Sequence, residues 1–193
     1  MDAGPHIQTP HIQTSSGRRV NPLAAAPADL DIGDIATSLA NQCRFGGHCK
    51  EFYSVAQHSC LASDLVLERE QDATSGLWAL LHDASEAYLG DLPHPLKHGT
   101  ELGRLYCLAE DELQKTVCER FGLPPEPPAS VLEIDRALLA AERRVLMVEA
   151  WEWPELAEAS TVVVAIDPWP PQRAFREFMI RYEELERRRA PPD

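Results

Sequence analysis

The spacing of apolar residues along the chain predicts a succession of α-helices. In most of the sequence these residues recur every three or four positions, which places them on one face of a helix. Glycines stand where the patterns stop, as at Gly90 and Gly122. The helices predicted in this way cover residues 32–39, 55–67, 76–89, 101–121, 131–151 and 172–188.

Two further local signals complete the prediction of the fold. Ser54 and Gln57 form the S-x-x-Q pattern of a capping box directly before the helix that begins at residue 55. Residues 160–166, which include three consecutive valines, are the only strand-like segment. Because one strand cannot form a sheet, we expect an all-α fold.

Length and proline distribution indicate a single domain. With 193 residues the chain has the size of one globular domain, and its 44% hydrophobic residues suffice for a sizeable core. Residues 1–28 contain four prolines and are expected to form an extended N-terminal segment. We therefore divide the chain into this segment, one domain over residues 29–189, and a short tail over residues 190–193.

The excess of acidic residues makes some classes of binding partner unfavourable. The 18 basic and 31 acidic side chains give a formal net charge of −13, which repels nucleic-acid polymers and anionic membrane surfaces. No run of apolar residues exceeds five, and the N-terminus lacks the pattern of a secretion signal. The five cysteines form no C-x-x-C pair and are expected to be reduced thiols. These features predict a cytoplasmic protein without membrane contact, in which any anionic substrate would need a local cation.

Candidate chemistry appears where polar residues interrupt an apolar helical pattern. In the helix predicted over residues 76–89, His82 and Asp83 interrupt an apolar run, and Glu86 lies four and three positions further on. On one helix these three side chains would share one sector. A buried carboxylate is costly unless a partner or a metal ion compensates it. The alternative is an exposed helix end with solvated carboxylates and a histidine in the core.

A second carboxylate stands on an apolar helix face. Asp135 follows Ile134 in the apolar stripe of the helix predicted over residues 131–151. An aspartate in the middle of a helix is unfavourable by propensity as well as by burial. Either a ligand role or a salt bridge to Arg44, Arg136 or another helix would explain it.

His58 has the same character, since it lies on the apolar stripe of the helix predicted over residues 55–67. A lone histidine on such a face is usually a hydrogen-bonded core residue. Together with His82, Asp83 and Asp135, however, it completes a set of two imidazoles and two carboxylates from three predicted helices. Two nitrogen and two oxygen donors suit a divalent transition metal ion with open positions for water and substrate.

Five sequence blocks contain or surround these residues. They read R-F-G-G-H at 44–48, F-Y-S-V-A-Q-H at 52–58, L-H-D-A-S-E-A-Y-L-G-D-L-P at 81–93, P-L-K at 95–97 and I-D-R-A-L-L-A-A-E at 134–142. The blocks together resemble the HD-domain metal-dependent phosphohydrolase superfamily, whose ordered signature is H…HD…D on an all-α scaffold. They are most similar to the branch that holds the YfbR-type 5′-deoxynucleotidases and the phage-encoded HD deoxynucleoside triphosphohydrolases. The likeness runs from about residue 12 to about residue 185.

The resemblance implies an HD-domain helical bundle and a role for each candidate residue. The implied ligands of a divalent ion, whether zinc, cobalt, manganese or magnesium, are His58, His82, Asp83 and Asp135. The implied catalytic residues, which act on the attacking water and its protons, are Glu86 and Asp91. The implied substrate contacts are Arg44, Phe45, His48 and Lys97.

These implied roles have different physical support. Arg44 and Lys97 suit phosphate, the first as a bidentate fork and the second as a point charge. Phe45 stands where the YfbR type has tryptophan, which keeps an aromatic ring near the sugar or base. The alternatives are that Arg44 and Lys97 are ordinary solvated surface residues and that Asp91 is a turn residue after Gly90.

The expected function is a metal-dependent phosphohydrolase that cleaves the 5′-phosphate or 5′-triphosphate from deoxynucleotides through a metal-activated water. Its partner is a small nucleotide, and the resemblance makes a homo-oligomer the expected state. Trp151, Trp153 and Trp169 would lie either in a subunit interface or in the core. Two alternatives stay open: a hydrolase of signalling nucleotides, and a nucleotide-binding module without catalysis. Glu86 and Asp91 favour an enzyme, because a binding module needs no groups that act on water.

Overall fold

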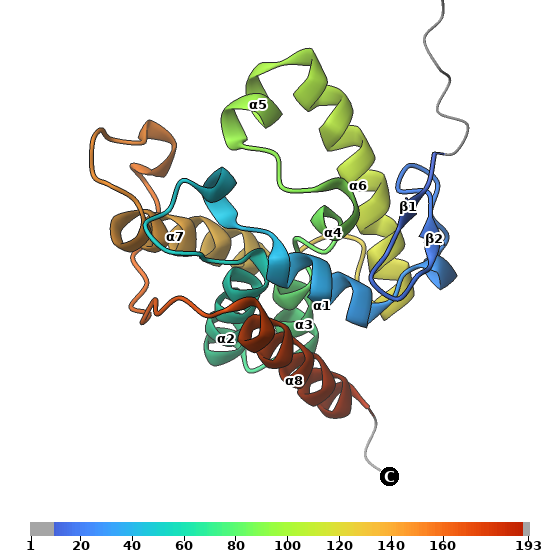
Figure 1. Cartoon of the computed structure of the whole chain (residues 1–193). Helices are drawn as coiled ribbons and strands as arrows, with labels where there is room; N and C mark the ends of the chain where they lie inside the picture. The colour runs from blue at the N-terminus through green and yellow to red at the C-terminus, as the bar shows by residue number, and fades with distance from the viewer. Residues whose placement is uncertain (1–9, 191–193) are drawn as a thin grey trace, which may run out of the picture.

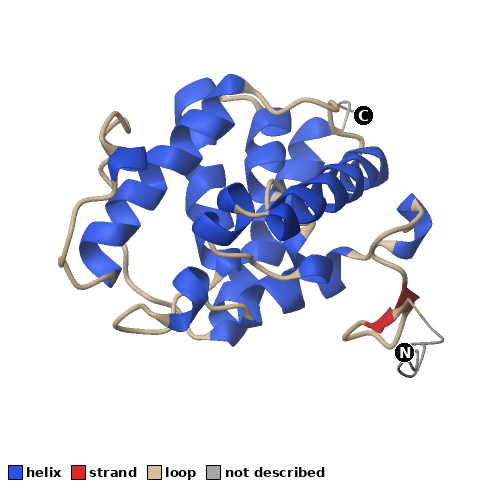
Figure 2. Ribbon diagram, turned by 90° about the horizontal axis from the view of Figure 1, so that it is seen from above, coloured by secondary structure: helices blue, strands red, loops and turns tan. Residues whose placement is uncertain are grey.

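The structure, a computed structural model, describes residues 10–190 and confirms the all-α prediction. This part of the chain is 62% helical. It contains eight α-helices and, at the periphery, one two-stranded hairpin (Figures 1 and 2). The α-helices are α1 Ile32–Asn41, α2 Val55–Glu70, α3 Ala73–Leu80, α4 Glu86–Leu89, α5 His94–Gly99, α6 Glu101–Phe121, α7 Ala129–Leu146 and α8 Pro171–Arg189. The strands are β1 Ile12–Gln13 and β2 Arg19–Val20, and short 3-10 helices are η1 Pro27–Asp29, η2 Arg44–Gly47 and η3 Pro154–Leu156.

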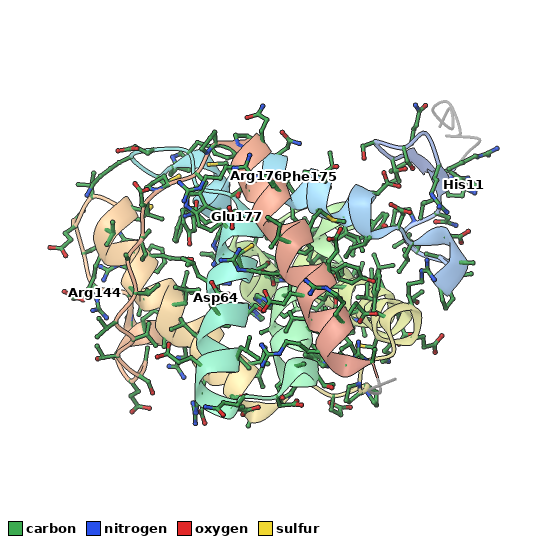
Figure 3. All side chains as sticks on the ribbon, turned by 90° about the horizontal axis from the view of Figure 1, so that it is seen from below. His11, Asp64, Arg144, Phe175, Arg176 and Glu177 are labelled. Carbon is green, nitrogen blue, oxygen red and sulfur yellow. The ribbon has the colours of Figure 1, made fainter. Side chains whose placement is uncertain are left out.

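The core forms where α2 and α3 pack against each other and α8 lies across both (Figure 1). The apolar face of α8 supplies Ala174, Phe178 and Leu185, which are all buried. At the rim of this contact, Arg181 of α8 pairs with Asp64 of α2 at 2.7 Å. Figure 3 labels Asp64 on α2, next to α8. None of the helices in residues 10–190 has the length and apolar character needed to cross a membrane.

Only half of the predicted capping box forms at the start of α2. The Ser54 hydroxyl oxygen accepts a hydrogen bond from the Gln57 backbone N–H at 3.1 Å, as the motif requires. The Gln57 side chain does not return to Ser54. It donates to the Asp167 carbonyl at 2.7 Å and accepts from the Trp169 N–H at 2.8 Å, which fastens the segment before α8 to α2. Trp169 is thereby buried in the core, whereas Trp151 is 66% exposed.

Several predicted elements differ from the observed ones. The helix expected over residues 76–89 is broken into α3 and α4, and the helix expected to reach residue 151 ends at Leu146. Residues 160–166 alternate in exposure like a strand, with Val163 96% exposed, but no neighbouring strand pairs with them. The alternation reflects an extended segment whose Val164 and Ile166 pack on the core.

Part of the N-terminal segment is folded, contrary to the expectation of an extended chain. β1 and β2 pair antiparallel with Ile12 opposite Val20. Asp34 of α1 accepts hydrogen bonds from the Ser15 hydroxyl at 2.6 Å and from the backbone N–H and hydroxyl of Ser16, both at 2.7 Å. The hairpin is therefore fastened to α1, while the first nine residues and the last three of the predicted tail lie outside the described residues.

α5 was not predicted and leans on the first turn of α6 in the upper part of Figure 1. The two helices approach at Gly103, where a methyl group would collide with the backbone oxygens of Leu96 and Lys97. A glycine at this position allows the close contact. The contact determines where Lys97 lies relative to the rest of the protein.

Candidate metal centre

The break between α3 and α4 creates the turn that carries His82 and Asp83. At the end of α3 the Leu81 N–H donates to the carbonyls of Leu77 and Trp78, and residues 81–85 turn instead of continuing the helix. The Gln114 side chain of α6 supports this turn, since its amide donates to the Leu81 carbonyl at 2.9 Å. His82 and Asp83 therefore project from a turn, and the prediction that they share one helix with Glu86 was wrong.

The two histidines point the same ring atom at each other. His58 on α2 is fully buried, and its Nδ1 lies 2.7 Å from Glu142 Oε1. His82 Nδ1 lies 2.7 Å from the Ala79 carbonyl oxygen. With both Nδ1 atoms engaged, the two Nε2 atoms face each other at 3.3 Å.

Two carboxylates close around the facing nitrogens. Asp135 Oδ1 on α7 lies 3.0 Å from His58 Nε2 and 3.7 Å from His82 Nε2. Asp83 Oδ2 lies 3.3 Å from His82 Nε2 and 3.9 Å from His58 Nε2. The four residues predicted as ligands are thus brought together from α2, the turn and α7. His58, His82 and Asp83 could hold a metal ion, and the half-exposed Asp135 leaves the cluster open to solvent on its side.

The partners of the two Nδ1 atoms indicate that both Nε2 lone pairs point into the cluster. A carbonyl oxygen only accepts, so His82 Nδ1 carries the proton in the neutral ring, and the ionised Glu142 assigns the same tautomer to His58. Both Nε2 atoms then present lone pairs to each other beside two carboxylates. Only a proton or a metal ion relieves this repulsion, and the donor set of two imidazoles and two carboxylates suits a divalent metal.

The pKa values reflect this concentration of negative charge. Burial lowers the pKa of His82, but Asp83 and Asp135 outweigh it and raise the value to about 9. Burial raises the pKa of Asp135, but hydrogen bonds to His58 and His82 hold it well below its ordinary value. In the absence of metal the cluster therefore retains a proton on an imidazole at neutral pH.

Arg44 lies against this cluster in η2, the loop between α1 and α2. Its Nη1 lies 3.6 Å from Asp83 Oδ2, and its Nε lies 3.2 Å from Glu142 Oε2. A salt bridge from Asp135 to Arg44 was one alternative explanation for Asp135. Arg44 instead pairs with Asp83 and Glu142. Arg44 is largely buried, and it is not an ordinary solvated surface arginine.

The residues after Arg44 adopt an unusual backbone. Phe45 has a left-handed φ of 57°, and its ring lies 5.8 Å from the Arg44 guanidinium carbon and 6.2 Å from the Trp153 ring. Left-handed backbone in a non-glycine residue is costly, and such residues are enriched at functional sites. His48, by contrast, is exposed at the end of the loop.

The predicted catalytic residues Glu86 and Asp91 lie within electrostatic range of Asp83. Glu86 is buried, its Oε1 lies 3.7 Å from Lys97 Nζ, and its Oε2 has no hydrogen-bond partner. Lys97 donates to Glu110 Oε1 at 2.7 Å and is not a solvated surface lysine. Burial, together with Asp83 and Asp91, raises the pKa of Glu86 well above its ordinary value. Asp91 is exposed at the edge of the site, and its backbone N–H donates to Gln42 Oε1 at 3.1 Å.

Several residues that support the site were not predicted from the sequence. Glu142 had a detectable signal, since it is a charged residue on the same apolar stripe of α7 as Asp135, seven positions later. Glu110 and Gln114 had none, because their contacts depend on how α6 packs against α5 and the turn.

The comparisons with known proteins indicate the family. No family model matches the chain. The chain is 39% identical over 176 residues to the uncharacterized protein YfdR of Escherichia coli (strain K12), a match that covers 90% of this chain and 94% of YfdR. It is also 39% identical over 149 residues to the uncharacterized protein RCAP_rcc00048 of Rhodobacter capsulatus, covering 75% of this chain and 73% of that protein. On this similarity over nearly its whole length, the chain belongs to the same family as YfdR.

Proposed function

We propose that the chain is a metal-dependent phosphohydrolase of the HD-domain superfamily that acts on the 5′-phosphate or 5′-triphosphate of deoxynucleotides in the cytoplasm. The observation that carries this proposal is the convergence of two Nε2 atoms and two carboxylates directly beside a buried arginine. Such a site combines ligands for a divalent ion with a group suited to phosphate. The order of the motif residues along the chain supports the same assignment.

In this proposal His58, His82, Asp83 and Asp135 hold the ion. When bound, a divalent metal lowers the pKa of its water toward ~7 and neutralises charge on the phosphoryl group. Arg44 binds the phosphate in this proposal: Glu142 pairs with its Nε and Asp83 lies 3.6 Å from its Nη1, which leaves Nη2 for a phosphate oxygen. Lys97 adds a second positive charge from α5.

Glu86 is the residue best suited to accept the proton of the attacking water. Its Oε2 has no hydrogen-bond partner, and its raised pKa makes it a stronger base than an ordinary carboxylate. In this proposal Asp91, at the edge of the same site, protonates the leaving oxygen. Phe45 and its aromatic neighbour Trp153 offer a surface for the sugar or base.

Hydrolysis assays with defined substrates test the proposal. The protein, loaded in turn with Mn²⁺, Co²⁺, Zn²⁺ or Mg²⁺, is incubated with deoxynucleoside mono- and triphosphates, alarmones and cyclic dinucleotides while phosphate and polyphosphate release is followed. We expect release from the deoxynucleotides. Turnover of the signalling nucleotides alone would replace the proposed substrate class, and metal-dependent nucleotide binding without any turnover would indicate a binding module.

A matched pair of variants ties the activity to the metal centre. Asp83→Ala removes a ligand and should abolish both hydrolysis and stoichiometric metal binding. Asp111→Ala changes an exposed aspartate on α6 and should leave both unchanged. Equal activity of the two variants would show that the hydrolysis does not come from this site.

A further inference from the structure

Glu142 is a buried carboxylate to which neither the sequence nor the proposed function assigns a role. It lies at the centre of the ion pairs and hydrogen bonds of the site. Glu142 on α7 is fully buried. Its Oε1 lies 2.7 Å from His58 Nδ1 and accepts a hydrogen bond of the same length from the Tyr53 hydroxyl. Its Oε2 lies 3.2 Å from Arg44 Nε. One side chain thus contacts both a candidate metal ligand and the candidate phosphate-binding residue.

Glu142 is completely buried, and both of its carboxylate oxygens lie against polar groups: Oε1 against His58 and Tyr53, and Oε2 against Arg44. An apolar side chain would fill the same position on the core face of α7 without the cost of desolvating a charge. The carboxylate at this position therefore has a task that an apolar residue could not perform.

That task follows from the two groups it contacts. By accepting from His58 Nδ1–H, Glu142 keeps the Nε2 lone pair of His58 directed at the ligand cluster, as carboxylates do behind metal-binding histidines. By pairing with Arg44 Nε, it holds the guanidinium so that Nη1 lies 3.6 Å from Asp83 Oδ2 and Nη2 is left for a phosphate oxygen. Asp83 is itself a candidate ligand, so Glu142 is the partner that retains Arg44 when Asp83 engages a metal.

We infer that Glu142 is a positioning residue that couples the two halves of the site by holding the metal ligand His58 and the phosphate-binding Arg44 in one buried unit. This inference rests on the metal centre of the proposed function. It predicts that loss of the carboxylate weakens metal binding and phosphate binding together, although in this arrangement Glu142 itself touches neither the metal ion nor the phosphate.

Metal titration of two variants tests the coupling. Glu142→Gln keeps the volume and an accepting oxygen but loses the charge that holds Arg44 and strengthens the bond to His58. It should weaken Mn²⁺ binding, measured by calorimetry, about 10- to 100-fold. It should also weaken binding of a non-hydrolysable phosphonate analogue of deoxyadenosine monophosphate to the Mn²⁺-saturated protein. Tyr53→Phe removes only the third contact of the same carboxylate and should change each affinity less than threefold.

A purely structural role of Glu142 would give a different result. It would lower the melting temperature of Glu142→Gln while the folded variant bound Mn²⁺ within twofold of the unmodified protein, and that outcome would overturn the inference. Since the measurement is metal binding, it also separates the two proposals. A protein that binds Mn²⁺ but hydrolyses no nucleotide would refute the proposed function and still decide the role of Glu142.

A measurement on the unmodified protein remains decisive if Glu142→Gln does not fold. Nitrogen-15 NMR of the Zn²⁺-loaded protein reports which ring nitrogen of each histidine carries the proton. We expect His58 protonated at Nδ1, with a slowly exchanging proton shared with Glu142. His58 protonated at Nε2 would contradict the inference whatever the variants show.

Discussion

The Nε2 atoms of His58 and His82 meet in the same cluster, but the Nδ1 atoms of the two rings have different partners. The Nδ1 of His58 faces a carboxylate, which makes its Nε2 a stronger donor to a metal, whereas the Nδ1 of His82 faces the backbone carbonyl of Ala79. A backbone partner cannot be lost by substitution. The orientation of His82 therefore depends on the fold alone, and that of His58 depends on a second side chain.

The environment of Lys97 leads to a prediction at this scale. Lys97 is shared between Glu110 and Glu86, so its charge is held beside the site and is not mobile in solvent. Lys97→Met keeps the aliphatic stem and removes the charge. If Lys97 binds substrate phosphate, steady-state kinetics should show the nucleotide KM raised at least about 10-fold, since a hydrogen bond to a charged group contributes ~1.5–3 kcal/mol.

The control for this variant is Lys115→Met. Lys115 is exposed on the same helix as Glu110 and forms only a surface pair with Glu112. This variant should leave the KM unchanged, because exposed pairs contribute little. A KM equal in both variants would show that Lys97 serves only to neutralise the two glutamates.

At the scale of elements, the helices whose ends carry local signals were predicted best. α6 matches its predicted range, because Thr100 accepts from the Gly103 N–H at one end and Gly122, with a φ of 62°, ends the helix at the other. The break after α3 could not be predicted, since the apolar period continues through it and its support comes from Gln114 on a distant helix. The hairpin strands have two residues each, too few for any period to be visible.

The same distinction applies to the candidate site. The identity of the four clustered residues could be predicted, because a charged or imidazole group on an apolar face needs a partner. Their arrangement could not, because the turn at His82 and the contact between α5 and α6 arise from packing. Glu142 lies between these cases: its position on the stripe was visible, but its partners Arg44 and Tyr53 come from a loop far away in the sequence.

The docking of the N-terminal hairpin should depend on pH through Asp34. Burial raises the pKa of this carboxyl, but hydrogen bonds from Ser15 and Ser16 outweigh burial and lower it below 3.8. A carboxyl whose pKa is lower in the folded state stabilises that state above its unfolded pKa, and the contribution is lost as the pH falls through the lowered value. The hairpin should therefore stay docked at neutral pH and loosen only below about pH 4. NMR of the Ser16 amide over this pH range measures the transition.

Asp34→Asn should remove this contribution at neutral pH. We expect a cost of about 1–3 kcal/mol in hairpin docking, the range for a buried charged acceptor that loses its bonds. Arg18 and Arg19 lie in the hairpin, so trypsin should cleave there faster in Asp34→Asn than in the exposed control Asp111→Asn. Equal cleavage rates would mean that other contacts hold the hairpin.

At the scale of the whole molecule, part of the net charge of −13 is concentrated at the candidate site. Asp83, Asp135, Glu86 and Asp91 all lie in or beside the proposed site, where they would repel a nucleotide phosphate. Arg44 and Lys97 are each already paired with carboxylates. In the proposed function, the positive charge that an anionic substrate needs therefore comes largely from the metal.

Nucleotide binding should consequently depend on metal. We expect equilibrium dialysis with the phosphonate analogue to show binding with Mn²⁺ and at least tenfold weaker binding after chelation, a difference of ~1.4 kcal/mol or more. Repeating the chelated sample at high salt tests whether long-range repulsion contributes, because salt screens it. Tight binding by the metal-free protein would contradict this account of the charge.

The close approach of α5 and α6 at Gly103 has a consequence for genetics. Any side chain at this position would push against the backbone oxygens of Leu96 and Lys97 and so displace the helix that carries the lysine. In a deep mutational scan that selects for activity, every missense codon at position 103 should be depleted as strongly as codons that replace the candidate ligands. A residue with no functional group would then appear in such a map as part of the active site.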